Sequence, residues 1–310
     1  MTAPVICIGA TLVDELFFCT NKTIPGTSNP AILKRYAGGV VRNIAHHLAM
    51  LDIPVQLLSV LGNDADGEWI LDDCRKNNIG IDSIIRVNDH TGKYASILNA
   101  DGTLFAAACT DPCARYLTPE LLQQQSAVLA TAGMMIADTN LATDTLSWII
   151  SFCRNNNMLL LIEPVSVTKA MKLKHIDLSG VFMLTPNEDE LPSLCNAAHQ
   201  TMDAAIDELM VRGVKNIWLR KGEKGSAIYT GEGNISLQVP VIKVTDSTGA
   251  GDAALAGWAA AYCYGADQLK CLQAGNVLAM EVLQVSGAVI PGINKEKLFD
   301  LIQKYYPDEK

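Results

Sequence analysis

The segment with the strongest chemical signal in this sequence is Asp246–Asp252 (DSTGAGD), which runs directly into an apolar helical stretch. A Gly-Ala-Gly turn that opens a helix leaves backbone N–H groups without partners, and the helix dipole adds positive potential there. Asp252, in the first turn, is predicted to be the general base that accepts the proton of an attacking hydroxyl. An anion hole for a phosphoryl group is predicted from the backbone of Gly249, Ala250 and Gly251.

Two other interpretations of this segment are weaker. If the glycines only allowed a capped helix to pack closely, Asp246 and Asp252 would have no task. Residues 249–254 also match the dinucleotide fingerprint GxGxxA, but that fingerprint requires a strand after the helix, ending in an acidic residue. Here a turn and a second predicted helix follow, and the sequence contains no GxxxxGK[ST] motif. A dehydrogenase and a P-loop enzyme are therefore disfavoured.

A second group of residues, near the N-terminus, has the chemistry to bind a polyol. Gly38 and Gly39 stand at the start of a predicted helix, where glycine lets a polar ligand approach the backbone. Asn43, one turn later, can both donate hydrogen bonds to hydroxyl groups and accept them. Asp14 follows a short apolar strand and is predicted to accept bonds from hydroxyls at the sheet edge. Taken singly, each residue has a purely structural alternative, so the prediction rests on their combination.

Four further segments follow or end predicted strands. Asn187 and Glu190 are three residues apart, so on a helix they would share a face and could hold hydrated Mg²⁺; a capping box is the equally good alternative. The turn Arg220–Gly225 has glycines and cations that suit a nucleotide phosphate, although a solvated charged turn has the same composition. Asp138 with Asn140, and Glu163 with Pro164, each stand at the end of an apolar strand, where open α/β sheets place ligands.

These candidates are positioned by short apolar runs that alternate with longer amphipathic segments, the pattern of an α/β protein. Several runs are apolar throughout, as is typical of central parallel strands covered on both faces. The predicted strands are Val5–Gly9, Val55–Val60, Met134–Ala137, Leu159–Ile162, Val181–Leu184 and Ile217–Arg220. The predicted helices are Val40–Leu51, Gly67–Asn77, Thr143–Asn155, Asp203–Arg212, Ala253–Tyr264 and Gln268–Gln284.

Two segments break this alternation. Residues 15–36 and 91–109 lack helical periodicity and are predicted to form extended strands. The residues Ala100-Asp101-Gly102 separate the predicted strands Tyr94–Asn99 and Thr103–Ala108. They predict a hairpin, because Asp-Gly favours a type I′ turn. The strands are expected to form a small β-lid that closes over a ligand and excludes water. The chain, residues 1–310, is therefore expected to be a single domain with a β-lid inserted twice.

The composition narrows the class of protein. The chain has 310 residues, 49% hydrophobic, with a formal net charge of −9 and no Lys/Arg-rich run, so no nucleic-acid partner is expected. No uncharged apolar run reaches the roughly 18 residues of a membrane span, and the N-terminus lacks the features of a signal peptide. Nine scattered cysteines without metal-ligand spacing predict reduced thiols in a cytoplasmic protein.

With these residues the chain resembles the ribokinase-like (PfkB-type) family of carbohydrate and nucleoside kinases. The resemblance covers nearly the whole chain and runs in order through Gly9 with Asp14, Gly38-Gly39 with Asn43, Leu61–Asp64, Asn187 with Glu190, and the terminal GAGD. It implies a three-layer α/β/α body with a mainly parallel, often nine-stranded sheet. It also implies a small inserted β-lid that often forms a homodimer interface.

The same resemblance implies a role for each candidate. Asp252 would be the general base beside the 249–251 anion hole, and Asn187 and Glu190 would lie near Mg²⁺ and phosphate. K⁺ binding beside the anion hole is common in the family, and Asp246 and Thr248 match part of that loop. The implied sugar contacts are Asp14, Gly38, Gly39 and Asn43. The implied ATP pocket includes Lys221, Gly222, Gly225 and Asn276.

Within the family, three pairs or runs of residues are most similar to the pseudouridine kinases. They are Ser28–Pro30 with Gly38–Ala45, Ala137–Asn140 with Leu146–Ile149, and Glu163–Ser166. The reaction implied is ATP plus pseudouridine giving pseudouridine 5′-phosphate and ADP. A ribose, fructose or purine-nucleoside kinase, or a non-catalytic nucleoside-binding protein, is the alternative. Further contacts to the nucleoside or sugar are expected from Asn29, Arg42, Asp138 and Asn140.

Overall fold

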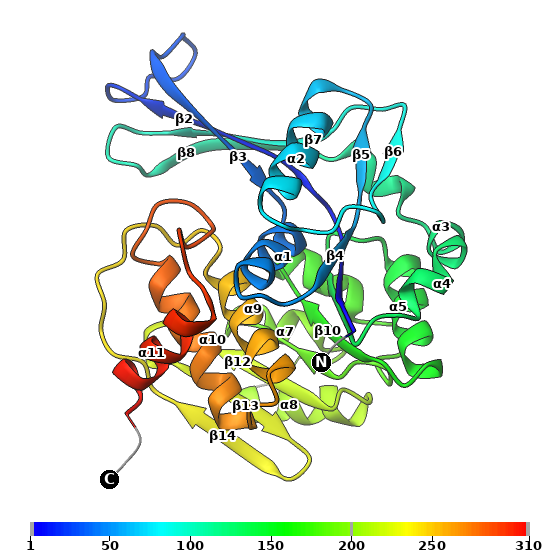
Figure 1. Ribbon diagram of the computed structural model, residues 1–310. Helices are drawn as coiled ribbons and strands as arrows, with labels where there is room; N and C mark the ends of the chain where they lie inside the picture. Colours follow the sequence, from blue (N-terminus) through cyan, green and yellow to red (C-terminus); the bar gives the residue numbers. More distant parts are fainter. Residues whose placement is uncertain (1–2, 199–200, 308–310) are drawn as a thin grey trace.

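The main sheet has eight strands in the order β14-β13-β12-β11-β10-β9-β1-β4 (Figure 1). In this computed structural model, residues 3–198 and 201–307 are described. All neighbours from β12 to β4 are parallel, and β13 and β14 extend one side as antiparallel strands. The predicted mainly parallel sheet is thus confirmed, with eight strands in place of nine. The strands are β1 (Val5–Ile8), β4 (Val55–Leu58), β9 (Met134–Asp138), β10 (Leu159–Glu163), β11 (Met183–Leu184), β12 (Asn216–Arg220), β13 (Ser226–Thr230) and β14 (Gly233–Leu237).

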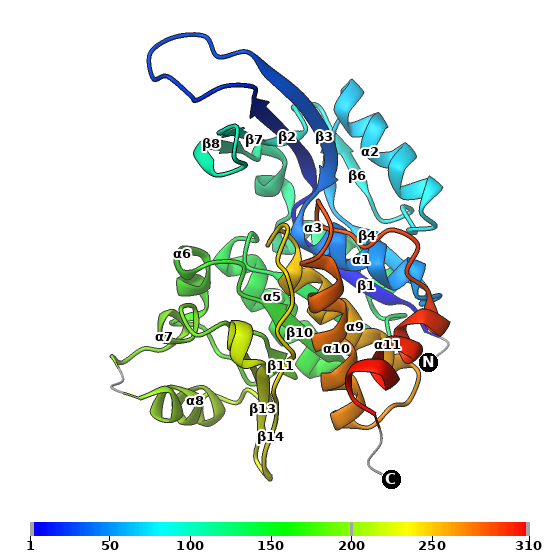
Figure 2. The same ribbon diagram turned by 90° about the vertical axis from the view of Figure 1, so that its left-hand side faces the viewer.

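Both faces of this sheet are covered by helices (Figure 2). Successive residues of β1 enter different cores. Val5 and Cys7 pack under α1 (Val40–Met50), α9 (Ala250–Cys263) and α10 (Gln268–Val282), whereas Ile6 and Ile8 pack with α5 (Thr143–Asn155) and its neighbours. Because side chains of a strand alternate between its two faces, strands that are apolar at every position must be buried from both sides. The result is the predicted three-layer α/β/α arrangement.

The six predicted helices are all present, and α5 has the predicted bounds. Two of them, α9 and α10, pack very closely. A Cβ atom at Gly257 of α9 would lie 2.6 Å from the backbone oxygen of Ala274 in α10, so only glycine fits there. This contact fixes α9 over the sheet. The helices are α1 (Val40–Met50), α2 (Ala65–Lys76), α3 (Pro119–Gln124), α4 (Ser126–Leu129), α5 (Thr143–Asn155), α6 (Val167–Ala170), α7 (Leu191–Leu194), α8 (Met202–Val211), α9 (Ala250–Cys263), α10 (Gln268–Val282) and α11 (Lys295–Tyr305).

Two parts of the main body differ from the prediction. The run Val55–Val60 is not one strand, because the chain leaves the main sheet at Ser59 and continues as β5 (Val60–Gly62), which pairs with β6 (Ile85–Val87). The Ser59 side chain donates to the Gly9 backbone oxygen at 2.7 Å, which holds this break in place. The β13–β14 hairpin was not predicted, since both strands are short and β14 is largely exposed.

A separate four-stranded sheet lies beyond one end of the main body (Figure 1). Its order is β3-β2-β7-β8, and only the β2–β7 pair is parallel. The strands predicted within 15–36 and 91–109 are confirmed, as is the hairpin. Its turn is not type I′, because Gly102 has φ 86° but Asp101 does not have a positive φ. The strands are β2 (Leu12–Cys19), β3 (Ala31–Gly38), β7 (Gly92–Leu98) and β8 (Leu104–Thr110).

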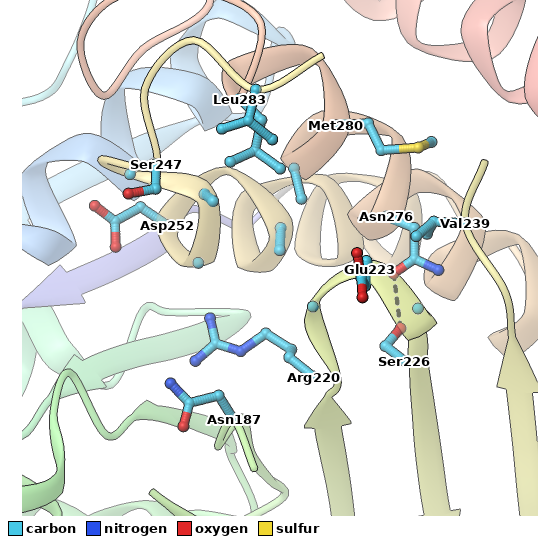
Figure 3. Close-up of a pocket in the computed structure, with 18 of the residues that line it drawn as sticks. Asn187, Arg220, Glu223, Ser226, Val239, Ser247, Asp252, Asn276, Met280 and Leu283 are labelled. Carbon is cyan, nitrogen blue, oxygen red and sulfur yellow. Dashed lines mark hydrogen bonds between the residues drawn. The ribbon is translucent and has the colours of Figure 1, made fainter. Parts of the chain in front are cut away.

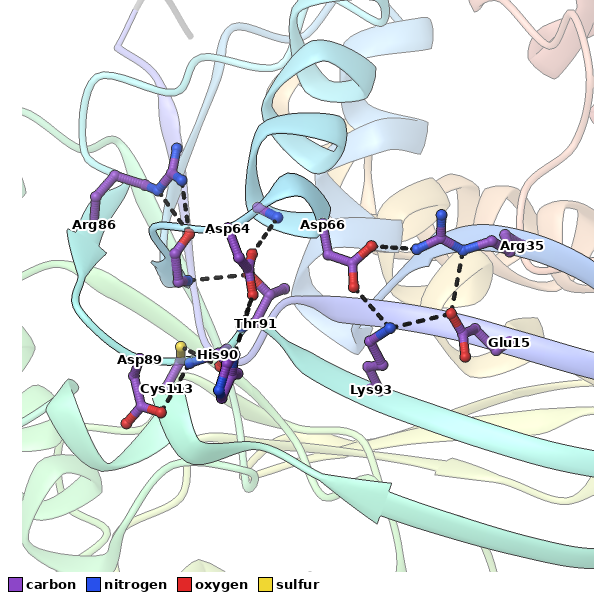
Figure 4. Close-up of polar contacts among 12 residues, drawn as sticks. Glu15, Arg35, Asp64, Asp66, Arg86, Asp89, His90, Thr91, Lys93 and Cys113 are labelled. Carbon is purple, nitrogen blue, oxygen red and sulfur yellow. Dashed lines mark hydrogen bonds and ion pairs between the residues drawn. The ribbon is translucent and has the colours of Figure 1, made fainter.

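One face of the small sheet is joined to α2 by ion pairs (Figure 4). Glu15 of β2 accepts from Arg35 of β3 at 3.3 Å and from Lys93 of β7 at 3.2 Å. Asp66, in the first turn of α2, pairs with both cations, at 2.8 Å in the case of Lys93. Because directly paired residues share a face, the neighbouring Asp14 must point to the opposite face, together with Tyr36 and Tyr94.

Most of the cysteines are core thiols. All nine lie within the described residues, and eight of them are buried. Burial raises the pKa of the Cys153 thiol to about 12, so it is a neutral core group. Within residues 3–198 and 201–307, no helix is both long and apolar enough to cross a bilayer.

Candidate active site

The start of α9 has the open backbone geometry that the GAGD segment predicted. Gly249 adopts the left-handed conformation with φ 76°, and the helix begins at Ala250. The first bond within the helix runs from the Ala253 N–H to the Gly249 oxygen at 2.8 Å. No side chain of the described residues caps this end. The N–H groups of the first turn are therefore available to an anion.

Asp252 lies in that first turn with only 8% of its surface exposed. Its Oδ2 accepts a hydrogen bond of 2.9 Å from Asn43 Nδ2, which joins α9 to the first turn of α1. Burial raises the pKa of Asp252 to about 7; the charges of Glu163 and Asp138 act in the same direction, while Asn43 and Arg220 oppose them. A carboxyl with this pKa can both accept and release a proton near neutrality.

A group of polar residues lies on the α1 side of Asp252. A Cβ atom at Gly38 would lie 2.3 Å from Asp14 Oδ2, so a side chain at position 38 would clash with the Asp14 carboxylate. Burial raises the pKa of Asp14 to about 6 and that of Asp138 also to about 6. Asp138 Oδ2 is buried without a hydrogen-bond partner among the described residues. These carboxyl groups are suited to hydroxyl donors, as expected for a polyol site.

On the other side of Asp252 the structure contains a cavity of about 680 Å³ (Figure 3). That volume lies in the range of nucleotide-sized ligands. Its apolar wall comes from the segment 239–244, from α10 with Met280, and from Leu283 directly after that helix. Asn276 also lines it and accepts a hydrogen bond of 2.7 Å from Ser226. The predicted nucleotide residues Gly222, Gly225, Asn276, Asn187 and Glu190 all line this one cavity.

Asn187 and Glu190 meet, but not on a helix. Asn187 Oδ1 accepts from the Glu190 N–H at 2.8 Å, and Glu190 Oε2 accepts from the Asn187 N–H at 3.0 Å. This reciprocal pattern has the form of the capping box that the sequence left open, and the turn that it closes leads into helix α7, which begins at Leu191. Both residues lie in this turn, so the structure does not bring them together on a helical face. Burial raises the pKa of Glu190. Their oxygen atoms on the cavity wall still fit Mg²⁺, which prefers such hard donors.

Several predicted contact residues have side chains already engaged elsewhere. Arg42 forms an ion pair with Asp73 of α2 and donates to the Ala37 oxygen at 3.1 Å. Lys221 Nζ lies 3.2 Å from the Tyr229 hydroxyl and is not among the cavity residues. Asn29 accepts from the Ile24 N–H at 2.9 Å and so shapes the β2–β3 loop. It lines a second cavity, of about 420 Å³, on the small sheet.

The predicted K⁺ ligands lie beside the anion hole. Asp246 accepts N–H bonds from Thr248 at 2.9 Å and from Gly287 at 3.0 Å. These bonds lower its pKa, although partial burial opposes them. Among the described residues there is no group of three or more His, Cys, Asp or Glu side chains that could hold a metal. K⁺ binding here stays a prediction.

Three more charged residues belong to the site; the sequence had indicated the segments of Glu163 and Arg220 but had not singled out Lys169. Glu163 and Arg220 form an ion pair of 2.7 Å beside Asp252. Lys169 of α6 donates to Asn140 Oδ1. Glu163 and Arg220 each end a buried strand, which is the position at which the sequence indicated them, whereas Lys169 lies in the short helix α6.

Comparison with known proteins identifies the family. The description "pfkB family carbohydrate kinase" matches residues 2–295. An uncharacterised sugar kinase of Escherichia coli (strain K12) is 33% identical over 74% of this chain, and the match spans 64% of that protein. The pseudouridine kinase of the same organism is 28% identical, with 84% of each chain covered.

Solved structures agree on the fold. The Arabidopsis thaliana ribokinase complexed with ribose and ATP superimposes with a TM-score of 0.87 over 98% of this chain and 99% of its own, at 22% identity. A protein from Escherichia coli assigned as a ribokinase II, in complex with ATP and Mg²⁺, has a TM-score of 0.83 over 98% of this chain and 100% of its own, at 18% identity. The chain belongs to the pfkB family of carbohydrate kinases and has the ribokinase-like fold.

Proposed function

We propose that the protein is an ATP-dependent kinase that phosphorylates the 5′-hydroxyl of a nucleoside, with Asp252 as the general base. One observation carries this proposal: a buried carboxyl group stands in the first turn of α9, between a polar acceptor site and a nucleotide-sized cavity. ATP would fill that cavity with its γ-phosphate toward the Gly249–Gly251 amides. Mg²⁺, near Asn187 and Glu190, would offset phosphate charge when bound.

The residues of the chain account for each step of such a transfer. Asn43, Asp14 and Asp138 would hold the acceptor hydroxyls and orient one of them toward the phosphorus. The Asp252 carboxylate would take that hydroxyl's proton as its oxygen bonds to the γ-phosphorus and the bond to ADP breaks. The first-turn N–H groups of α9 would stabilise the charge on the equatorial oxygens.

Pseudouridine is the acceptor that we propose. The relative named a pseudouridine kinase matches 84% of this chain. In addition, Lys169 donates to the Asn140 carbonyl and the Asn140 side chain also bonds Asp138, which leaves one Asn140 amide N–H and the lysine as donors for the carbonyl oxygens of a uracil ring. Ribose, fructose or a purine nucleoside is the alternative, since relatives of this chain include a ribokinase and a guanosine-inosine kinase.

The small sheet would serve as the lid of a single kinase domain. Asp14, one of the proposed acceptor residues, lies on one face of that sheet, and the tip of the sheet bears exposed apolar side chains. A second copy of the chain would cover this apolar tip. The exposed residues are Ile32, Leu33, Leu104 and Phe105.

Replacing the base should abolish turnover but not binding. For Asp252→Asn we expect kcat to fall about 10²–10⁴-fold, because the amide cannot accept the proton. The variant should stay folded, since the raised pKa of Asp252 means that its charged form is disfavoured in the folded protein. ADP release and calorimetric nucleoside binding measure the two effects. Asp203→Asn, which changes an exposed first-turn aspartate of α8, is the matched control. Unchanged turnover in Asp252→Asn would remove this residue from the mechanism.

The pH profile should report the same group. Since the deprotonated form is the base and burial raises the pKa of Asp252 to about 7, log kcat/KM should rise with unit slope as pH increases toward that value, then level off. Initial rates from about pH 5 to 9, with thermal unfolding followed in parallel, test this. A flat profile between pH 5 and 7 in a folded enzyme would contradict the assignment.

The acceptor can be identified by competition among related compounds. We expect kcat/KM for pseudouridine to exceed that for uridine, adenosine, ribose and fructose, with the new phosphate on the 5′-oxygen by ³¹P NMR. Uridine is the sharpest comparison because it differs only in how the base is linked to the ribose. Equal or higher values with a free sugar would overturn the acceptor assignment and leave the kinase assignment standing.

The assembly is expected to be a dimer of 33.4 kDa chains, which light scattering measures directly. Leu33→Glu and Phe105→Lys, at exposed positions of β3 and β8, should convert it to a monomer, because a charge cannot be buried cheaply in an apolar contact. Val211→Glu, an exposed apolar residue on α8, is the control and should leave the mass unchanged. A wild-type protein that is monomeric at micromolar concentration would refute this expectation.

A further inference from the structure

Arg220, the last residue of β12, is a charged side chain in a strand that is otherwise apolar apart from Asn216 at its start. Alternation along β12 puts Arg220 on the same face as Trp218, which packs under α9 and α10. Its guanidinium is directed toward the first turn of α9 (Figure 3). A Cβ atom at Gly251 would lie 2.3 Å from Arg220 Nη1, so the guanidinium occupies the space that a side chain there would need.

The contacts of Arg220 leave part of its donor capacity unused. Nη2 donates to Glu163 Oε1 at 2.7 Å and lies 3.6 Å from Glu190 Oε2. Nε is buried without a hydrogen-bond partner among the described residues. Arg220 itself lines the cavity, so its guanidinium has donor capacity left for a ligand there.

The charge balance of the cavity also indicates that Arg220 contacts an anionic ligand. Among the described residues that line it, four are acids, and Arg220 is the single lysine or arginine. The neighbouring lysines are directed elsewhere: Lys221 contacts Tyr229, and Lys224 lies 3.5 Å from Glu188. A triphosphate that enters this cavity therefore meets one cation of the protein itself. The four acids are Glu163, Glu190, Glu223 and Asp252.

We propose that Arg220 binds the γ-phosphate of ATP and stabilises the phosphoryl group while it is transferred beside the α9 amides. This inference rests on the proposed kinase function. Glu163 would hold the guanidinium in place, as its other oxygen is fixed by a hydrogen bond of 2.6 Å from Thr185. A planar guanidinium can keep this carboxylate bond on one edge and offer another edge to phosphate oxygens.

The test compares two nucleotides that differ by the γ-phosphate. With Mg²⁺ present, Arg220→Gln should weaken binding of the non-hydrolysable ATP analogue AMP-PNP at least about 10-fold more than binding of ADP, because only the former reaches the guanidinium. Its kcat should fall about 10²–10³-fold. Arg220→Lys, which keeps the charge but not the fork, should recover part of both effects. Lys215→Gln, an exposed cation before the opposite end of β12, should change neither.

Loss of one partner from a buried ion pair can unfold a protein, so the pair is also removed together. The double variant with Glu163→Gln and Arg220→Gln has no unpaired buried carboxylate at position 163. Its melting temperature shows whether stability lost in Arg220→Gln is recovered. If either folded variant distinguishes AMP-PNP from ADP as well as the wild type does, or loses affinity for both equally, the proposal is overturned. The nucleotide comparison needs no acceptor, so wild-type protein that binds AMP-PNP but releases no ADP with any acceptor would contradict the kinase function alone.

Discussion

The site depends on the burial of several acidic side chains close together beneath the first turn of α9. Asp252, Glu163, Glu190 and Asp138 are all less than one-tenth exposed. Such a group is tolerable only where opposite charge and hydrogen-bond donors are close. The structure supplies the Arg220 guanidinium and the Asn43 amide as fixed side-chain partners, and the positive end of α9 beside them.

The rest of the main body can be understood as the means of holding this cluster. Parallel strands bring their carboxyl ends to a common edge, so residues that end β9, β10 and β12 meet although they are far apart in sequence. Above that edge, α9 is held by α10 through a contact that admits only glycine at position 257, and Trp218 packs beneath both helices. A shift of α9 would move Asp252 and the open N–H groups together.

The two halves of the site are built differently. The nucleotide-sized cavity is bounded by the main sheet, α10 and the segment 239–244, with a largely apolar wall. The proposed acceptor half includes Asp14 of the small sheet, whose other face is attached to α2 by the ion pairs of Glu15, Arg35, Lys93 and Asp66. This division matches a reaction in which one substrate is held by apolar contacts and the other by hydroxyl contacts.

Much of the structure of this protein could be predicted from its sequence, because it depends on interactions between residues that are close in the chain. The helix start at Gly249–Asp252, the glycine pair before α1, the alternation of strands and helices, and the separate small sheet all follow from conformational preferences and periodicity within a few residues. Long-range pairing decided the rest. Whether Arg220 or Lys221 faces the cavity depends on which face of β12 lies under α9, and Arg42 is engaged by Asp73, 31 residues away. Asn187 and Glu190 bond each other in a turn, and α7 starts only after them, at Leu191. Spacing in sequence cannot show such partners, since a side chain's direction at the end of a strand is set by the register and packing of the elements around it.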